Sequence, residues 1–261
     1  MLRVVNCVPN MKKMSNCNGI FSYKTDIGKV RKTNEDEALV LTNATGDIML
    51  VVCDGMGGHV KGDIAARIAI DVMKNEFKNK PSFTSSNDVK RFLSRATKKA
   101  NDIIFQSAKE NDLSKKMGTT MTVVIIRKNN LFILNIGDSR AYLIDDNTIE
   151  QVTEDDSYVN YLYHLGKITL EEMDVHPKRH ILMNALGLFQ NANFEINVIH
   201  YDGCKVFLCT DGLYTMLSEE EMLSIITTSD SVDDKCDMLV KNANRNGGLD
   251  NIAVALWEVE K

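Results

Sequence analysis

Apolar and polar residues alternate along the chain with two different periods, which separate predicted helices from predicted strands. Apolar side chains recur at helical spacing over residues 63–77 and again over residues 88–109, and Asp88 stands where the second helix would have its N-cap. Between them, residues 79–87 contain Pro81 and three serines, which indicates a loop.

After Gly118 the pattern changes to runs that are rich in β-branched residues. These runs are apolar on both faces, so we expect strands that are covered on both sides. The predicted strands are residues 119–126, 131–136 and 141–144, joined by hairpin turns at residues 128–130 and 137–139.

The remaining segments complete a mixture of strands and helices. Residues 153–190 are more polar and predict short helical pieces. Further strands are predicted within residues 20–60 and near 194–200, 205–210 and 251–259, and further helices at 218–227 and 233–244. This order indicates an α+β fold in which helices pack on antiparallel sheets. Since no linker or repeat divides the chain, we expect one domain over residues 20–261 and a poorly ordered N-terminal extension over residues 1–19.

Composition excludes several classes of protein. The 261 residues are 44% hydrophobic and carry a net charge of -5, which argues against a nucleic-acid partner. No apolar run reaches the roughly 20 residues that cross a bilayer, so we expect no membrane partner. The six cysteines include no Cys-x-x-Cys pair, which argues against structural zinc and favours reduced thiols in the cytoplasm. We also expect a monomer.

Four short acidic motifs lie at the ends of apolar runs, where predicted strands stop or begin. A single Asp-Gly is most often a turn, but several carboxylates at the rim of buried strands would suit Mg²⁺ or Mn²⁺. Two such ions, about 3.5–4 Å apart, can share a carboxylate and a water, lower the pKa of that water and neutralise a phosphoryl group. The motifs are Asn34-Glu35-Asp36, Asp54-Gly55, Asp211-Gly212 and Asp250-Asn251.

Arg31 stands just upstream of the first acidic motif. A guanidinium group there could bind phosphate oxygens in a bidentate manner. Taken alone, Arg31 would be read as a solvated side chain.

Together these motifs resemble the metal-dependent protein phosphatases of the type 2C family. The matching segments follow the family's order over residues 20–259, and their combination is far more specific than any one of them. They are residues 26–36, 53–59, 117–120, 136–141, 210–213 and 250–253. The resemblance implies a four-layer α-β-β-α sandwich, in which two antiparallel sheets lie between helix pairs.

Residues 153–190 resemble the flap of the bacterial single-domain members of this family. Those members act on phosphoserine and phosphothreonine in proteins and oppose eukaryotic-like Ser/Thr kinases. By resemblance, the partners would be a Ser/Thr kinase and its substrates, and hydrolysis would use direct attack by a metal-activated water. Tyr161 and Leu165 of the flap lie at helical spacing with two further apolar residues, so we expect them to pack the flap onto the body.

The resemblance also assigns roles to the acidic residues. Asp54 would bridge two Mg²⁺ or Mn²⁺ ions. The Gly55 carbonyl and Glu35 would bind one ion, with Asp36 supporting the cluster. Asp211 and Asp250 would hold the other ion, and Arg31 would bind the phosphate. Asn251 would either orient Asp250 or simply begin a strand.

Two positions leave alternatives open. Asp138 either pairs with Arg140 in a turn or, as the resemblance implies, helps Asp211 to hold a third and weaker metal. Met56 stands where many eukaryotic members carry a histidine that is proposed as the general acid. The leaving alcohol would then take its proton from water or from another residue, and His59 is a weak candidate.

Two other functions compete with this hypothesis. A phosphatase of anti-sigma-factor antagonists is a related branch, but the long flap favours the branch that is paired with kinases. A pseudophosphatase would lack metal-binding acids, whereas this chain retains Glu35, Asp36, Asp54, Asp211 and Asp250.

Overall fold

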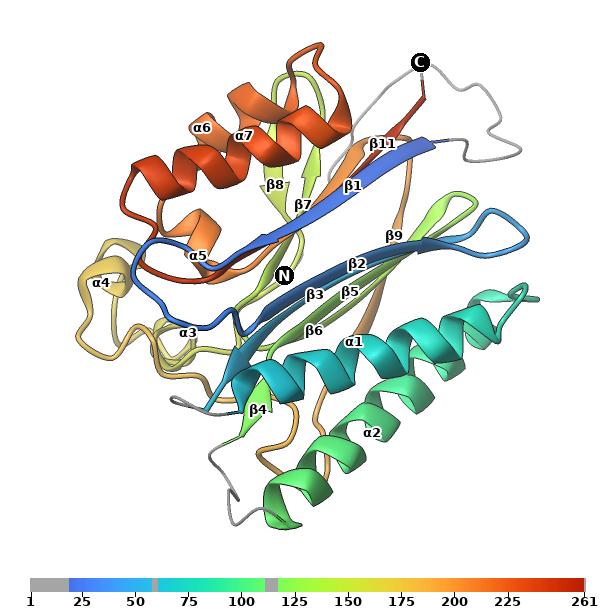
Figure 1. The fold of residues 1–261 in the computed structure, drawn as a ribbon, viewed down its shortest axis with the longest axis horizontal. Helices are drawn as coiled ribbons and strands as arrows, with labels where there is room; N and C mark the ends of the chain where they lie inside the picture. Colours follow the sequence, from blue (N-terminus) through green and yellow to red (C-terminus); the bar gives the residue numbers. More distant parts are fainter. Residues whose placement is uncertain (1–18, 58–60, 111–116, 261) are drawn as a thin grey trace.

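Two antiparallel β-sheets lie face to face between two layers of helices in the computed structural model (Figure 1). The structure describes residues 19–57, 61–110 and 117–260. The arrangement confirms the α+β class and the four-layer sandwich. Most of the predicted extension lies outside the described residues, although Gly19 already begins the first strand.

The first sheet contains the two chain-terminal strands side by side. Its order is β1 (Gly19–Asp26), β11 (Ile252–Val259), β10 (Lys205–Cys209), β7 (Arg140–Ile144) and β8 (Ile149–Gln151). The second sheet has the order β2 (Asp36–Thr42), β3 (Ile48–Met56), β5 (Met121–Arg127), β6 (Asn130–Ile136) and β9 (Ile196–His200), and the short β4 (Gly118–Thr119) pairs with β3.

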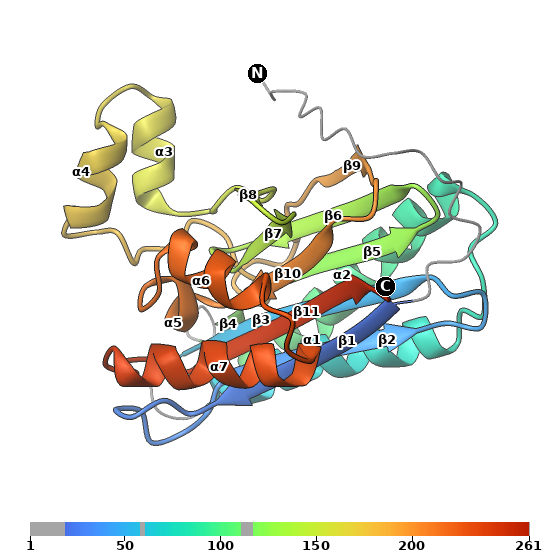
Figure 2. The same cartoon turned by 90° about the horizontal axis from the view of Figure 1, so that it is seen from above.

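Each sheet has its own helices on its outer face (Figure 1). The second sheet is covered by α1 (Gly62–Lys78) and α2 (Ser86–Glu110), and the first by α5 (Asp211–Tyr214), α6 (Glu219–Ile226) and α7 (Val232–Arg245). The predicted flap contains α3 (Tyr158–His164) and α4 (Leu170–Val175), which extend beyond the ends of the sheets in Figure 2.

Three apolar cores hold these four layers together. Alternate residues of β3 face opposite sides: Leu50 and Val52 contribute to the core between the sheets, while Val51 and Cys53 pack against α1 and α2. A third core lies between the first sheet and its helices. Both faces of the central strands are therefore covered, as their two-sided apolar sequence predicts.

Two local predictions were wrong. Residues 137–139 do not close a hairpin, because β6 pairs with β5 and β9 whereas β7 pairs with β10 and β8. The segment instead carries the chain from one sheet to the other. Asp88 is not an N-cap, since α2 begins at Ser86; its carboxylate accepts hydrogen bonds from the Thr84 amide (3.0 Å) and Lys80 Nζ (3.0 Å).

The strand topology brings distant segments to one end of the sandwich. Asp36, at the start of β2, is directly opposite Asp54 near the end of β3. In the other sheet β10 ends just before Thr210, and β11 begins at Ile252, after Asp250-Asn251. The acidic motifs therefore meet where both sheets end. No helix in the described part of the chain is long and apolar enough to cross a membrane.

Candidate metal centre

Asp54 is held by the backbone on both sides of its strand. Its amide donates a hydrogen bond to Thr120 Oγ1 (2.8 Å), and its carbonyl accepts from the Thr120 amide (2.8 Å) and from Thr119 Oγ1 (2.9 Å). These contacts leave little freedom in the backbone, so the direction of the Asp54 carboxylate is fixed by the sheet.

Glu35 and the Gly55 carbonyl lie against the start of α1. The Gly55 amide donates to the Glu35 carbonyl (3.0 Å). A Cβ at Gly62 would lie 2.6 Å from both Glu35 Oε2 and the Gly55 carbonyl oxygen, and a Cβ at Gly55 would lie 2.3 Å from the Gly62 carbonyl oxygen. Only glycine fits at either position, and the close approach leaves two oxygen donors side by side.

Thr210 connects the two sheets beneath the cluster. Its buried hydroxyl donates to Asp36 Oδ2 (2.6 Å) and accepts from the Ala253 amide (2.8 Å). Sequence reasoning missed this residue, although its position just before Asp211-Gly212 was a usable signal.

Asp211 and Asp250 are brought together by a second glycine contact. A Cβ at Gly212 would lie only 1.9 Å from the Asn251 carbonyl oxygen, so the turn after β10 can approach the start of β11 only with glycine there. Asn251 does more than orient Asp250: its side chain accepts from the Glu35 amide (2.9 Å) and donates to the carbonyls of Ile27 and Thr33 (2.9 Å each). It therefore organises the loop that carries Arg31 and Glu35.

Arg31 lies against the cluster, half-exposed. Its Nη2 donates to Asp250 Oδ2 at 2.6 Å. Burial opposes the charged form of Arg31, but Asp250, Asp54 and Glu35 outweigh it, and the pKa of Arg31 is raised.

The carboxyl groups are crowded and mostly buried. Burial, followed by repulsion from neighbouring acids, raises the pKa values of Asp36, Asp54 and Asp211 above their usual range. For Asp54 these neighbours are Asp36, Asp211, Asp138 and Asp250. A divalent cation among these groups would offset both the burial and the repulsion.

The available donors fit a hard divalent cation. All of them are oxygens, which Mg²⁺ and Mn²⁺ prefer. Asp211 Oδ1 is buried and has no hydrogen-bond partner among the described residues, which is costly unless a ligand or ion completes it. In residues 19–57, 61–110 and 117–260, no three His, Cys, Asp or Glu side chains are already arranged closely enough to hold a metal ion.

Asp138 lies at the crossing between the sheets. Burial and the nearby Asp211 raise the pKa of Asp138 to about 7. The alternative pairing of Asp138 with Arg140 is wrong, because Arg140 binds Asp155 through Nε (3.1 Å to both carboxylate oxygens) and Nη2 (2.7 Å). Arg140 also stacks on the ring of Tyr214 at 3.7 Å, and the Tyr214 hydroxyl donates to the Asp138 carbonyl (3.0 Å).

The flap packs only in part as the sequence predicted. Tyr161 and Leu165 are 51% and 50% exposed, whereas Tyr158 and Leu162 are half-buried, and Val159 is the buried residue of α3. The stem of the flap is held by Asp156, whose Oδ2 accepts from the Gly137 amide (3.1 Å) and from Asn184 Nδ2 (2.9 Å). Helical spacing alone could not show which neighbour the apolar stripe would face.

The residue that could donate a proton to the leaving alcohol is not among the described residues. Met56 is the last residue of β3 and follows Asp54-Gly55 directly. His59, the weak candidate for a general acid, lies outside the described residues.

Comparison with known proteins identifies relatives of the whole chain. The model of the family described as protein phosphatase 2C matches residues 29–249. The serine/threonine phosphatase stp of Listeria welshimeri is 35% identical over 238 residues, which are 90% of this chain and 94% of that protein. Protein phosphatase PhpP of Streptococcus pneumoniae is 34% identical over 236 residues, 90% of this chain and 95% of that protein.

Solved structures give the same answer. Serine/threonine phosphatase Stp1 from Staphylococcus aureus superimposes with a TM-score of 0.87 at 30% identity and covers 97% of this chain and 100% of its own. The catalytic domain of the phosphatase PstP, crystallised with two manganese ions, gives a TM-score of 0.80 at 29% identity and covers 93% of this chain and 99% of its own.

Proposed function

Because the chain belongs to the protein phosphatase 2C family, we propose that the carboxylate cluster at the common end of the two sheets is its metal-binding catalytic centre. The chain is a metal-dependent protein serine/threonine phosphatase. The observation that carries the proposal is the convergence of buried Asp36 with half-buried Asp54 and Asp211, with one Asp211 oxygen lacking a partner among the described residues.

The proposed roles follow the geometry of the cluster. Asp54, which is repelled by acids from both sheets, would be shared between two divalent ions. Glu35 and the Gly55 carbonyl, side by side at Gly62, would hold one ion, and Asp211 and Asp250 would hold the other. When bound, the ions supply a water of lowered pKa and neutralise charge on the phosphoryl group.

Asp36 supports the cluster from behind. Its Oδ2 accepts the Thr210 hydrogen bond, so the carboxylate is held between the sheets. This position supports a role for Asp36 in fixing Asp54 and Asp211 rather than in contacting the substrate.

Arg31 orients the phosphate. It uses Nη2 on Asp250 and keeps further guanidinium donors that can reach phosphate oxygens. Since Asp250 holds the guanidinium at the edge of the cluster, Arg31 would hold the phosphoryl group beside the carboxylates.

The leaving alcohol takes its proton from water in this proposal. Met56 has no proton to donate at the position after Asp54-Gly55. A general acid supplied by the protein would have to come from elsewhere in the chain.

A third and weaker metal site is proposed at Asp138 and Asp211. The proximity of these carboxyl groups is supported by the effect of Asp211 on the pKa of Asp138. Tyr214 holds the Asp138 backbone in place through its hydroxyl.

The wider setting is also a proposal. We place residues 20–261 in one phosphatase domain whose flap covers residues 153–190. Its partners would be phosphoserine and phosphothreonine proteins, including a Ser/Thr kinase and its substrates. We also propose a monomer in the cytoplasm; the described cysteines are thiols rather than disulfides, which supports a reducing compartment.

The test compares three proteins on p-nitrophenyl phosphate and on a phosphothreonine peptide, with and without Mn²⁺. Asp54→Asn and Asp211→Asn should each lose at least about a hundredfold in kcat/KM, because each removes a charged ligand. Asp230→Asn makes the same chemical change at an exposed residue of the α6–α7 loop and should keep full activity.

Calorimetric titration with Mn²⁺ separates metal binding from folding. The two cluster variants should bind fewer or weaker ions while their far-UV circular dichroism is unchanged. Full activity in Asp54→Asn or Asp211→Asn would overturn the assignment of the site.

A further inference from the structure

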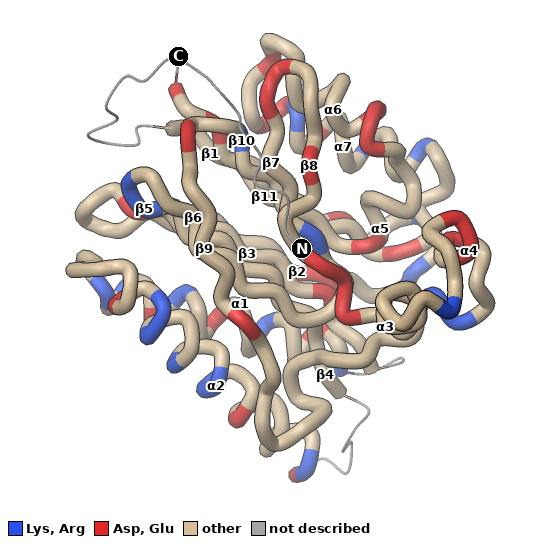
Figure 3. Tube along the Cα trace, turned by 180° about the vertical axis from the view of Figure 1, so that it is seen from behind, with Lys and Arg blue, Asp and Glu red and all other residues tan. Residues whose placement is uncertain are grey.

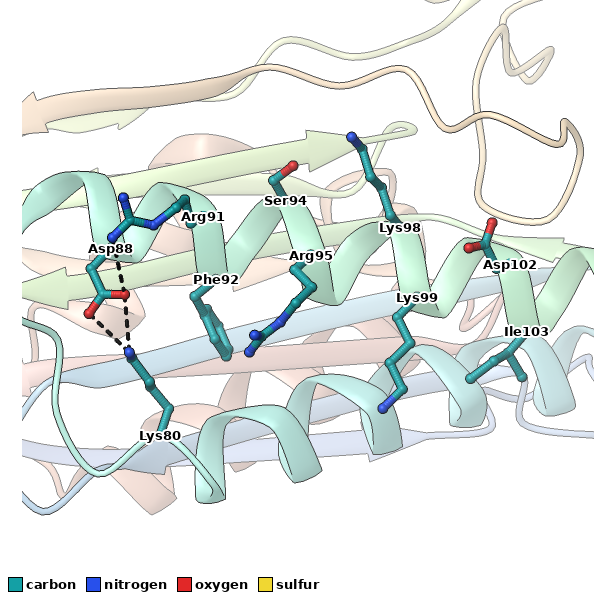
Figure 4. A pocket seen from close by; sticks show the side chains of 10 residues that line it. All are labelled: Lys80, Asp88, Arg91, Phe92, Ser94, Arg95, Lys98, Lys99, Asp102 and Ile103. Carbon is teal, nitrogen blue, oxygen red and sulfur yellow. Dashed lines mark hydrogen bonds and ion pairs between the residues drawn. The ribbon is translucent and has the colours of Figure 1, made fainter.

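A groove between α1 and α2 stands apart from the carboxylate cluster and shares no residue with it. It has a volume of about 780 Å³, and its lining runs along α2 from Asp88 to Ile103, with Lys80 contributed from the loop after α1 (Figure 4). Five of its lining side chains are cations and two are acids; with Glu76, which pairs with two of these cations, the excess is two positive charges in a chain of net charge -5. Figure 3 shows Lys and Arg positions as blue segments along α2.

Two of the cations are oriented by an acid of α1. Glu76 binds the charged ends of Arg95 (Nη2, 3.2 Å) and Lys99 (Nζ, 2.8 Å), while its own side chain is only 19% exposed. The side chains of Arg95 and Lys99 are 70% and 53% exposed, and both extend toward α1 in Figure 4. Because Glu76 already orients these two side chains, less side-chain entropy is lost when a ligand binds.

Asp88 does the same at the other end of the groove. It binds Lys80 at 3.0 Å and approaches Arg91 at 3.8 Å. Arg91 is 73% exposed and donates no hydrogen bond to another described residue, and Arg95 donates only through Nη2 among those residues. Both guanidinium groups thus keep donors that suit carboxylates.

The spacing of the cations matches an extended peptide. Arg91, Arg95 and Lys99 follow one another at intervals of four residues, which is about 6 Å per step along a helix. Alternate residues of an extended chain project to the same side and are about 6.7 Å apart. Three acidic residues at alternate positions of a strand would therefore meet the three cations in register.

Other anionic occupants fit less well. A lipid surface would need exposed apolar anchors, whereas Phe92 is 3% exposed and Ile103 is the apolar lining residue that reaches solvent, at 40%. A small phosphate compound would need a more enclosing pocket.

We propose that this groove binds an extended segment of a partner protein that carries acidic side chains at alternate positions. The bound segment lies along α2, with its carboxylates on Arg91, Arg95 and Lys99. The site gives the enzyme a contact with acidic proteins that is independent of the phosphorylated residue in the catalytic centre.

The experiment measures fluorescence anisotropy of a dye-labelled Gly/Ser peptide with glutamate at three alternate positions, added to the full chain. Arg91→Gln/Arg95→Gln should weaken binding about tenfold, because two charge-assisted contacts are lost. Lys241→Gln/Arg245→Gln removes the same charge from exposed positions on α7 and should leave the affinity unchanged. Raising the salt concentration should weaken binding to the original protein.

Two further arms fix the kind of occupant. An isomeric peptide with its three glutamates adjacent should bind more weakly than the alternating peptide. Equal affinity of both double variants for the alternating peptide would overturn the site. If Arg91→Gln/Arg95→Gln weakened binding to anionic lipid vesicles but not to the peptide, the peptide would be overturned as the occupant. Hydrolysis of p-nitrophenyl phosphate should be unchanged in the groove variant, so failure here leaves the catalytic proposal standing.

Discussion

Thr210→Val should destabilise the protein, because the Thr210 hydroxyl serves two buried groups at once. It donates to Asp36 Oδ2 (2.6 Å) and accepts from the Ala253 amide (2.8 Å). Thr210 is fully buried and Asp36 is 3% exposed, so water cannot replace either contact. Valine keeps the shape of the side chain and removes only the hydroxyl.

The expected loss follows from the two hydrogen bonds. A bond to a charged group contributes about 1.5–3 kcal/mol and a neutral bond about 0.5–1.5 kcal/mol. Thr210→Val should therefore lower the free energy of unfolding by about 2–4 kcal/mol. With a urea dependence of about 3 kcal/mol per M, the midpoint should fall by about 1 M.

Thr97→Val is the matched control. Thr97 is also fully buried, but its Oγ1 has no hydrogen-bond partner among the described residues. Removing that hydroxyl should change the free energy of unfolding by less than about 0.5 kcal/mol, or raise it slightly. Urea unfolding at pH 7.5, in EDTA, would measure both variants. The reasoning fails if Thr97→Val costs as much as Thr210→Val, or if Thr210→Val is neutral.

Three further predictions concern the metal centre and the helical layer. Asp211→Asn should relieve repulsion among the carboxylates, so in EDTA its melting temperature should rise, by about 3 °C per kcal/mol. Mn²⁺ should raise the melting temperature of the original protein but not that of the variant. An equal Mn²⁺ response in both proteins would contradict this. Gly62→Ala would place a Cβ 2.6 Å from Glu35 Oε2 and should weaken Mn²⁺ binding at least about tenfold in calorimetry; unchanged affinity would remove Glu35 from the site. Hydrogen bonds from the Thr84 backbone and from Lys80 lower the pKa of Asp88 to about 2. Because the folded pKa lies below the usual 3.8, Asp88 stabilises the protein above that pH, a contribution lost as pH falls toward 2. Asp88→Asn should thus lower stability at pH 7 and hardly change it at pH 2, as urea unfolding at the two values would show.

Much of the fold and the acidic cluster could be predicted because local sequence determines them. Strand runs that stop at Asp-Gly place the carboxylate at a strand end whatever the topology, so Asp54 and Asp211 were accessible to sequence reasoning. The helices α1, α2, α6 and α7 also follow from their periodic apolar faces.

Features that depend on which segments meet in space could not be predicted. The Gly137–Ser139 segment has the composition of a hairpin turn, and only strand pairing shows that it crosses between sheets. Asp36, which accepts the Thr210 hydrogen bond, lies 174 positions from it, and Glu35 lies 216 positions from Asn251, in segments whose relative placement the sequence does not give. The sequence also could not show that Arg140 binds Asp155 rather than Asp138, because this pairing depends on the fold of the flap stem.

The carboxylate cluster and the flap are held in place to different degrees, and the physical reason lies in the charges of the cluster. Crowded carboxylates repel one another, so they stay in place only if rigid elements over-determine them. Here that support comes from two sheets with three apolar cores and from the cross-links of Thr210 and Asn251. The α3 and α4 helices of the flap bury little apolar surface, which leaves Tyr161, Leu165 and Val175 exposed. Core substitutions beneath the strand ends should therefore disturb metal binding, whereas substitutions of these exposed flap residues should change the recognition of protein substrates and leave hydrolysis of a small phosphate ester intact.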